Sequence, residues 1–264
     1  MPTPDRLGFG KVRRLCYEPA PFSDTTMLAI EGYANPVFCA LDRPDLPAAV
    51  ELARSLVGTV GGVKVGLELF TANGPPAVRE VSALGLPVFL DLKLHDIPNT
   101  VAGAVRAVLP LAPAMLTLHA SGGRRMLEAA VAAARSAPRR PWLLGITVLT
   151  SLGDEDLAET GVAGTTLDHA LRMAALCLEC RLDGVVCSPH EIEGLRRRFG
   201  HELRLVVPGI RAAGDAVGDQ KRTMAPAEAV ALGADVLVIG RPITQAPAPR
   251  AAAETLARGL ARAA

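Results

Sequence analysis

The chain has 264 residues, of which half are hydrophobic, 3% are aromatic and 21% are charged, with a formal net charge of +1. This length suits one large α/β domain, while the near-neutral charge and the few aromatic residues give no support for nucleic-acid binding. No apolar run approaches the ~20 residues that span a membrane, and the basic N-terminus lacks the apolar segment of a signal peptide.

Residues 1–34 precede the first predicted element and leave their own role open, so we treat them as an N-terminal extension of a catalytic domain at 35–264. From there on, short apolar runs alternate with longer stretches of helical periodicity. The predicted strands are 37–41, 62–65, 88–92, 115–119, 143–148, 184–187, 205–207 and 236–239. The predicted helices are 46–57, 75–84, 100–109, 123–135, 165–179, 190–199, 226–232 and 250–263.

Apolar strands separated by helices indicate a parallel sheet with crossover helices. About eight such units at this length predict an α/β fold of the single-domain (β/α)8 TIM barrel type rather than an open sheet. A dinucleotide-binding fold would need G-x-G-x-x-G after the first strand, where this chain has Leu41-Asp42-Arg43-Pro44. We therefore expect an active site at the C-terminal ends of the barrel strands.

The third predicted strand carries charges into an apolar run, which is costly unless they are paired or used. Regular alternation points Asp91, Lys93 and His95 toward one face, and Asp96 follows just beyond them. A structural ion pair is the alternative. However, only four of the 28 basic residues are lysines, and both Lys64 and Lys93 fall in apolar runs. Because the pKa of lysine shifts on burial, lysine suits proton transfer better than arginine.

Other polar residues also fall at strand ends. Asp42 ends the first strand, Lys64 lies in the second, His119 ends the fourth, and Thr150 and Ser151 follow the fifth. Each could be a solvated loop residue by itself, and for His119 and Thr150 that interpretation is favoured. Taken together, they converge on one mouth of the predicted barrel.

The loops after the seventh and eighth strands predict a phosphate site, because barrels commonly bind phosphate there. Pro208-Gly209-Ile210-Arg211 leads into a glycine-rich loop that runs to Gln220, and Gly240-Arg241 follows the eighth strand. Glycines let backbone N–H groups approach an anion, and an arginine can hold a phosphate with two hydrogen bonds. Turn glycines with a surface arginine are the alternative.

The five cysteines, at 16, 39, 177, 180 and 187, are odd in number and irregularly spaced, which favours reduced thiols and a cytoplasmic location. Cys177 and Cys180 form a C-x-x-C pair within a helix-like pattern. Because no second pair accompanies it, we expect neither a metal nor a redox function there.

With these motifs in view, the chain resembles the orotidine 5′-monophosphate decarboxylase family over roughly residues 37–245. The motifs of the third and eighth strands are together highly specific, whereas each short motif alone is weak. The stretch before the first strand is longer than the family needs. The matching stretches are Ala40-Leu41-Asp42, Val63-Lys64-Val65-Gly66, residues 89–101, Leu149-Thr150-Ser151, Pro208-Gly209-Ile210-Arg211 with Asp219-Gln220, and Ile239-Gly240-Arg241-Pro242.

The resemblance implies decarboxylation of orotidine 5′-monophosphate to UMP, the last step of de novo pyrimidine nucleotide synthesis, without metal or cofactor. It implies that Lys93 is the proton donor to C6 within a charge array of Lys64, Asp91, Lys93 and Asp96. It also implies a homodimer in which Asp96 and Thr100 reach the neighbouring subunit's site. The implied substrate-binding residues are Asp42 at the ribose, Ser151 at the pyrimidine, and Pro208, Gln220, Gly240 and Arg241 at the phosphate, with 211–220 as a lid.

Two other functions stay open. Mg²⁺-dependent sugar-phosphate lyases, of the 3-keto-gulonate-phosphate decarboxylase or hexulose-phosphate synthase type, share the D-x-K-x-x-D pattern. They carry Glu where this chain has Lys64, and a cation at that position would repel a metal ion. The other possibility is a catalytically inactive barrel that binds nucleotides, against which the complete set of charged residues argues.

Overall fold

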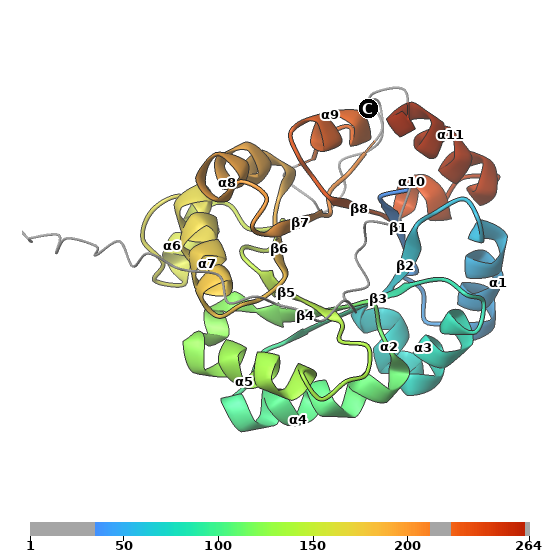
Figure 1. Cartoon of the computed structure of the whole chain (residues 1–264). Coiled ribbons are helices and arrows are strands. Elements are labelled where there is room, and N and C mark those ends of the chain that lie inside the picture. Colours follow the sequence, from blue (N-terminus) through green and yellow to red (C-terminus); the bar gives the residue numbers. More distant parts are fainter. Residues whose placement is uncertain (1–34, 212–222, 262–264) are drawn as a thin grey trace, which may run out of the picture. The chain divides into compact units, whose positions relative to one another are not determined.

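Eight short apolar strands pair in parallel, each with the next, and β8 closes onto β1 (Figure 1). The computed structural model of the protein describes residues 35–211 and 223–261, so the predicted extension at 1–34 lies outside the described residues. The strands are β1 (Val37–Ala40), β2 (Gly62–Val65), β3 (Val88–Leu94), β4 (Met115–His119), β5 (Trp142–Ile146), β6 (Gly184–Val186), β7 (Arg204–Val207) and β8 (Val236–Ile239). This confirms the predicted single-domain (β/α)8 TIM barrel.

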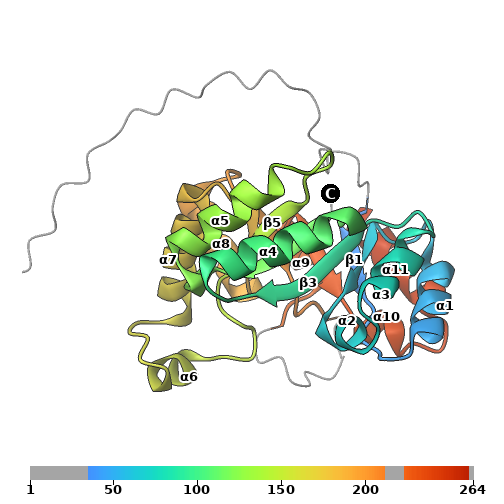
Figure 2. The same cartoon turned by 90° about the horizontal axis from the view of Figure 1, so that it is seen from below.

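Helices surround the closed sheet, and α4 and α5 lie side by side along one side of it (Figures 1 and 2). The helices are α1 (Leu46–Leu56), α2 (Leu67–Asn73), α3 (Pro75–Ser82), α4 (Pro98–Val108), α5 (Arg124–Ala134), α6 (Asp154–Glu159), α7 (Thr166–Glu179), α8 (Ile192–Phe199), α9 (Pro226–Ala231), α10 (Arg241–Thr244) and α11 (Pro249–Ala261), with single 3-10 turns at Leu109–Leu111, Ala120–Gly122 and Pro189–Glu191. Among the helices of the described residues, none has both the length and the apolar character needed to cross a membrane.

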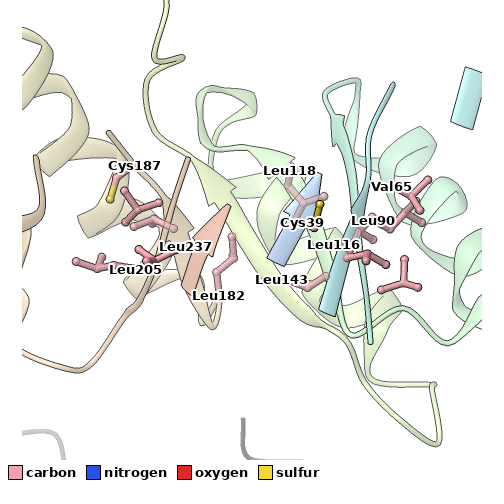
Figure 3. Packing of buried hydrophobic residues seen from close by; sticks show 14 of the residues in the cluster. Cys39, Val65, Leu90, Leu116, Leu118, Leu143, Leu182, Cys187, Leu205 and Leu237 are labelled. Carbon is pink, nitrogen blue, oxygen red and sulfur yellow. The ribbon is translucent and has the colours of Figure 1, made fainter. Parts of the chain in front are cut away.

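Side chains of the strands alternate between the barrel interior and the layer under the helices. On β3, Val88 and Leu90 belong to the large buried cluster under the helices, whereas Phe89 lines the pocket inside the barrel. Figure 3 shows members of the outer cluster, among them Leu116 and Leu237. Each fully buried leucine contributes roughly 1.5–3 kcal/mol, so aliphatic residues can build this core despite the few aromatics.

The N-terminal ends of two strands are tied by aspartates that lie before the next strand. The carboxylate of Asp183 accepts from the backbone N–H of Leu143, at 2.7 Å, where β5 begins. The carboxylate of Asp235 likewise accepts from the N–H of Leu205, at 2.6 Å, where β7 begins. Both aspartates also bind an arginine. These bonds stabilise the N-terminal end of the barrel, whereas the pocket forms at the C-terminal ends of the strands.

Candidate active site

A pocket of about 440 Å³ opens at the C-terminal ends of the strands. Its lining combines apolar side chains of the strands with acidic and basic side chains. The residues that line it are Ala40, Asp42, Lys64, Phe89, Asp91, Lys93, Ile146, Val148, Leu149, Thr150, Val186, Pro208, Arg211, Val238, Gly240, Arg241 and Gln245. A volume of this size is typical of a small-molecule site.

Four charged side chains, from β2, from β3 and from the segment just after β1, form a continuous chain of ion pairs on one wall. The Lys64 ammonium lies 3.0 Å from Asp42 Oδ1 and 3.7 Å from Asp91 Oδ2. The Lys93 ammonium donates to the same Asp91 oxygen at 2.8 Å. The side chains of Lys64 and Asp91 are 12% and 11% exposed, so water screens their interaction little. Opposite charges therefore alternate along the wall and stabilise one another.

This environment lowers the pKa of Asp91. Burial by itself raises the pKa of this carboxyl, but the charges of Lys64 and Lys93, with hydrogen bonds from Lys93 and Thr117, outweigh burial. The pKa is thus held below the ordinary value for aspartate, and the carboxylate is ionised at neutral pH.

An irregularity in β3 places Asp91 and Lys93. Leu90 pairs with Leu116 and Leu94 with Leu118, so residues 91–93 of β3 lie opposite Thr117 alone. Lys93 has φ of 51°, in the left-handed region that few non-glycine residues adopt. The sequence predicted regular alternation of side chains through residues 91–95. The structure instead has a bulge here, which bends the strand and changes the direction of its side chains.

Histidines lie beside this bulge. His95 stacks on His119, with 5.2 Å between ring centroids, and neither ring lines the pocket. Burial lowers the pKa of His119, and the neighbouring His95 and Lys93 lower it further against the opposing effect of Asp91. His119 is therefore neutral at physiological pH.

Residues that the sequence predicted for a phosphate also line the pocket, next to Asp42. Pro208 follows β7, Gly240 follows β8, and Arg241 begins the short helix α10. Gln245, just past α10, also lines the pocket. The sequence offered no signal for Gln245, because only the turn of α10 brings it back toward the strand ends.

Other predicted site residues lie off the pocket lining. Asp96 and Thr100 are exposed near the start of α4, and Asp96 Oδ1 accepts from the N–H of Ile97 at 2.6 Å. Ser151 is exposed beside Thr150, which does line the pocket. Gln220 and the predicted lid beyond Arg211 lie outside the described residues.

The C-x-x-C pair lies in and just after α7. Cys177 is buried in α7, and burial raises the pKa of its thiol to about 12; the pKa of Cys180 is also raised, mainly by burial. In the part of the chain that the structure describes, no group of three or more His, Cys, Asp or Glu side chains is arranged to hold a metal ion.

Comparison with known proteins gives one consistent result. Residues 35–256 match the model of the orotidine 5′-phosphate decarboxylase / HUMPS family. An orotidine 5′-phosphate decarboxylase of Rhodospirillum rubrum is 54% identical over 231 residues, covering 84% of this chain and 93% of the relative. One of Novosphingobium aromaticivorans is 51% identical, covering 84% and 98%. The crystal structure of orotidine 5′-phosphate decarboxylase from Lactobacillus acidophilus matches with a TM-score of 0.73 and 33% identity, covering 86% and 99%.

Proposed function

This chain belongs to the orotidine 5′-phosphate decarboxylase / HUMPS family, and we propose that it is a carboxy-lyase that converts orotidine 5′-monophosphate to UMP in pyrimidine biosynthesis. The observation that carries this proposal is the alternating array of Asp42, Lys64, Asp91 and Lys93 on one wall of the pocket. Its relatives at about 50% identity are named for this activity. Their names favour decarboxylation of orotidine 5′-phosphate over the other activity, HUMPS, that the family's name covers.

The chemical difficulty is the electron pair left at C6 of the pyrimidine when the bond to the carboxylate breaks. In our mechanism CO₂ leaves, the pair stays on C6, and the Lys93 ammonium stabilises it and then donates a proton to form the C6–H bond. Solvent returns a proton to Lys93. Asp91 holds the ammonium in place through the 2.8 Å hydrogen bond, so little reorganisation is needed as charge develops.

Lys64 argues for a mechanism that uses no metal ion. Its ammonium lies between the carboxylates of Asp42 and Asp91, where a Mg²⁺-dependent lyase would use acidic oxygens to bind the cation. A fixed positive charge at that position repels a divalent ion. We therefore propose that protein charges, with neither metal nor cofactor, perform the chemistry.

Different residues of the pocket suit the different parts of the nucleotide. Asp42, whose side chain is 56% exposed, can accept a hydrogen bond from a ribose hydroxyl. Gly240 and Arg241, beside Pro208, suit the phosphate, because a glycine backbone and an arginine favour an anion. We propose Thr150 and its neighbour Ser151 for the pyrimidine edge, and Gln220 for the phosphate.

Asp96 and Thr100 would complete the site of a second subunit. Both are exposed, and Ile97 between them is 67% exposed, which is high for a large apolar residue. We propose a homodimer in which this segment covers the partner's pocket. We also propose a cytoplasmic location, which the buried, reduced thiols of Cys39, Cys177 and Cys180 support.

The deciding experiment is the loss of absorbance of orotidine 5′-monophosphate with purified protein in EDTA. We expect rapid turnover, and we expect Lys93→Ala to lower kcat by at least about a thousandfold. Lys93→Arg is the matched control, because it keeps the charge but cannot release a proton at neutral pH. It should bind UMP and remain inactive. UMP binding by an inactive wild type would identify a binding protein, and Mg²⁺-dependent turnover of sugar phosphates would identify a lyase.

A further inference from the structure

A buried hydroxyl links the two central residues of the charge array. Thr117 lies on β4 and is fully buried. Its Oγ1 donates to Asp91 Oδ1 at 2.9 Å and accepts from the backbone N–H of Lys93 at 2.8 Å. A threonine hydroxyl has one proton to donate. Because the Lys93 N–H supplies the bond that Oγ1 accepts, that proton is directed to Asp91.

The bulge of β3 explains why Lys93 needs this partner. Three residues of β3 face Thr117 alone, so the regular exchange of backbone hydrogen bonds between β3 and β4 is interrupted. A backbone N–H that loses its acceptor in a buried place is costly. The Thr117 side chain supplies the acceptor, and it does so where Lys93 holds a left-handed φ of 51°.

The same hydroxyl sets the orientation of the Asp91 carboxylate. Thr117 binds Oδ1, which leaves Oδ2 turned toward the ammonium groups of Lys93 and Lys64, at 2.8 and 3.7 Å. Rotation of the carboxylate would break the bond to Thr117. One hydroxyl therefore fixes the backbone that carries Lys93 and the carboxylate that holds its ammonium.

We propose that Thr117 is a positioning residue for the proposed decarboxylation, on which this inference rests: its hydroxyl holds Lys93 and Asp91 in the geometry that proton transfer to C6 requires. Thr117 does not line the pocket, so it acts through these two residues and not on the substrate. Catalytic groups that move by about 1 Å lose on the order of a hundredfold in rate. The residues proposed for the phosphate follow β7 and β8, not β3, so we expect substrate binding to depend little on this shift.

The test compares two variants. Thr117→Val keeps the branched shape and removes the hydroxyl, whereas Thr117→Ser keeps the hydroxyl. We expect Thr117→Val to lower kcat about 10- to 100-fold while KM changes less than about threefold. We expect Thr117→Ser to stay within about threefold of wild-type kcat. Thermal unfolding checks that each variant is folded, and Thr117→Ala replaces the valine variant if that one is not.

Two results would overturn the proposal: a valine variant with kcat close to wild type, or a serine variant as slow as the valine variant. If wild type itself fails to decarboxylate the nucleotide, the proposed function fails. The role of Thr117 is then decided by crystal structures of wild type and Thr117→Val. Loss of the left-handed φ at Lys93, or of its contact with Asp91, supports the role, and unchanged geometry rejects it.

Discussion

At the scale of single residues, the charge array depends on the absence of a side chain at Gly66. A Cβ at this position would lie 2.6 Å from Lys64 Nζ and 3.2 Å from Asp42 Oδ1. The backbone of Gly66, with φ of −95° and ψ of −173°, is accessible to any residue. Alanine would therefore act by displacing the Lys64 ammonium and not by backbone strain.

We expect Gly66→Ala to lower kcat/KM about 10- to 100-fold with a change in unfolding free energy below about 1 kcal/mol. Steady-state kinetics and urea unfolding measure the two quantities. Gly259→Ala is the control, because Gly259 is exposed on α11 and its Cβ would meet nothing within 4 Å. It should keep full activity and gain up to about 1 kcal/mol from helix propensity. Full activity of Gly66→Ala would contradict the account of Lys64.

Asp91 gives a prediction for acid pH at the same scale. Its pKa is lower in the folded protein than its ordinary value, so its ionised form stabilises the fold. That contribution is complete above the ordinary carboxyl pKa and is lost as pH falls through the lowered one. The free energy of unfolding of Asp91→Asn should thus lie roughly 2 kcal/mol below wild type at pH 7, and the gap should narrow on acidification. Urea titrations from pH 7 to pH 3 measure this difference in unfolding free energy. A difference that grows as the pH falls would show that the ionised form of Asp91 does not stabilise the fold.

At the scale of elements, Arg196 joins α8 to the segments before β7 and β8. Its guanidinium donates to the carbonyls of Gly200, Leu203 and Gly233 at 2.7–2.9 Å and also binds Asp235. The side chain is 11% exposed. The planar guanidinium makes all of these hydrogen bonds at once, which a lysine ammonium cannot do.

We expect Arg196→Ala to lower the free energy of unfolding by about 2–4 kcal/mol, because Asp235 and three carbonyls, two of them partly or fully buried, lose their hydrogen bonds to the guanidinium. Arg196→Lys should restore less than half of the loss, and kcat should not change in either variant, since Arg196 lies away from the pocket lining. Arg197→Ala is the control: its side chain is 73% exposed and pairs with Glu193, so the change should stay within about 0.5 kcal/mol. If both alanine variants lowered the free energy of unfolding equally, the hydrogen bonds of the Arg196 guanidinium would contribute nothing to stability.

The elements also show what a sequence can and cannot predict. Burial makes each parallel strand a short apolar run, so β2, β4 and β8 begin and end at the predicted residues. Because parallel strands end at one mouth, Asp42, Lys64 and Lys93 could be placed together in advance. The helices α2, α6 and α10 were missed, since helices of seven, six and four residues are too short for a periodic pattern. The bulge in β3 and the role of Thr117 depend on pairing with β4, which no local pattern encodes.

At the scale of the whole molecule, the described barrel leaves Asp96 at its surface although Asp91 and Lys93 line the pocket. If Asp96 serves the partner's site, each active site of the proposed homodimer takes Lys93 from one subunit and Asp96 from the other. A C2 dimer then has two shared sites. Defects in Lys93 and in Asp96 can therefore compensate for each other when they lie in different subunits.

We expect Lys93→Ala and Asp96→Asn to be nearly inactive alone and to regain activity when their subunits are exchanged. In the mixed dimer one site carries both changes, while the other has an intact Lys93 and an intact Asp96. Half of the dimers are mixed, so activity should approach about a quarter of wild type. The double variant mixed with Lys93→Ala is the control, and it should stay inactive because no Lys93 is present. A mixture of the single variants no more active than its components would mean that Asp96 does not act across an interface.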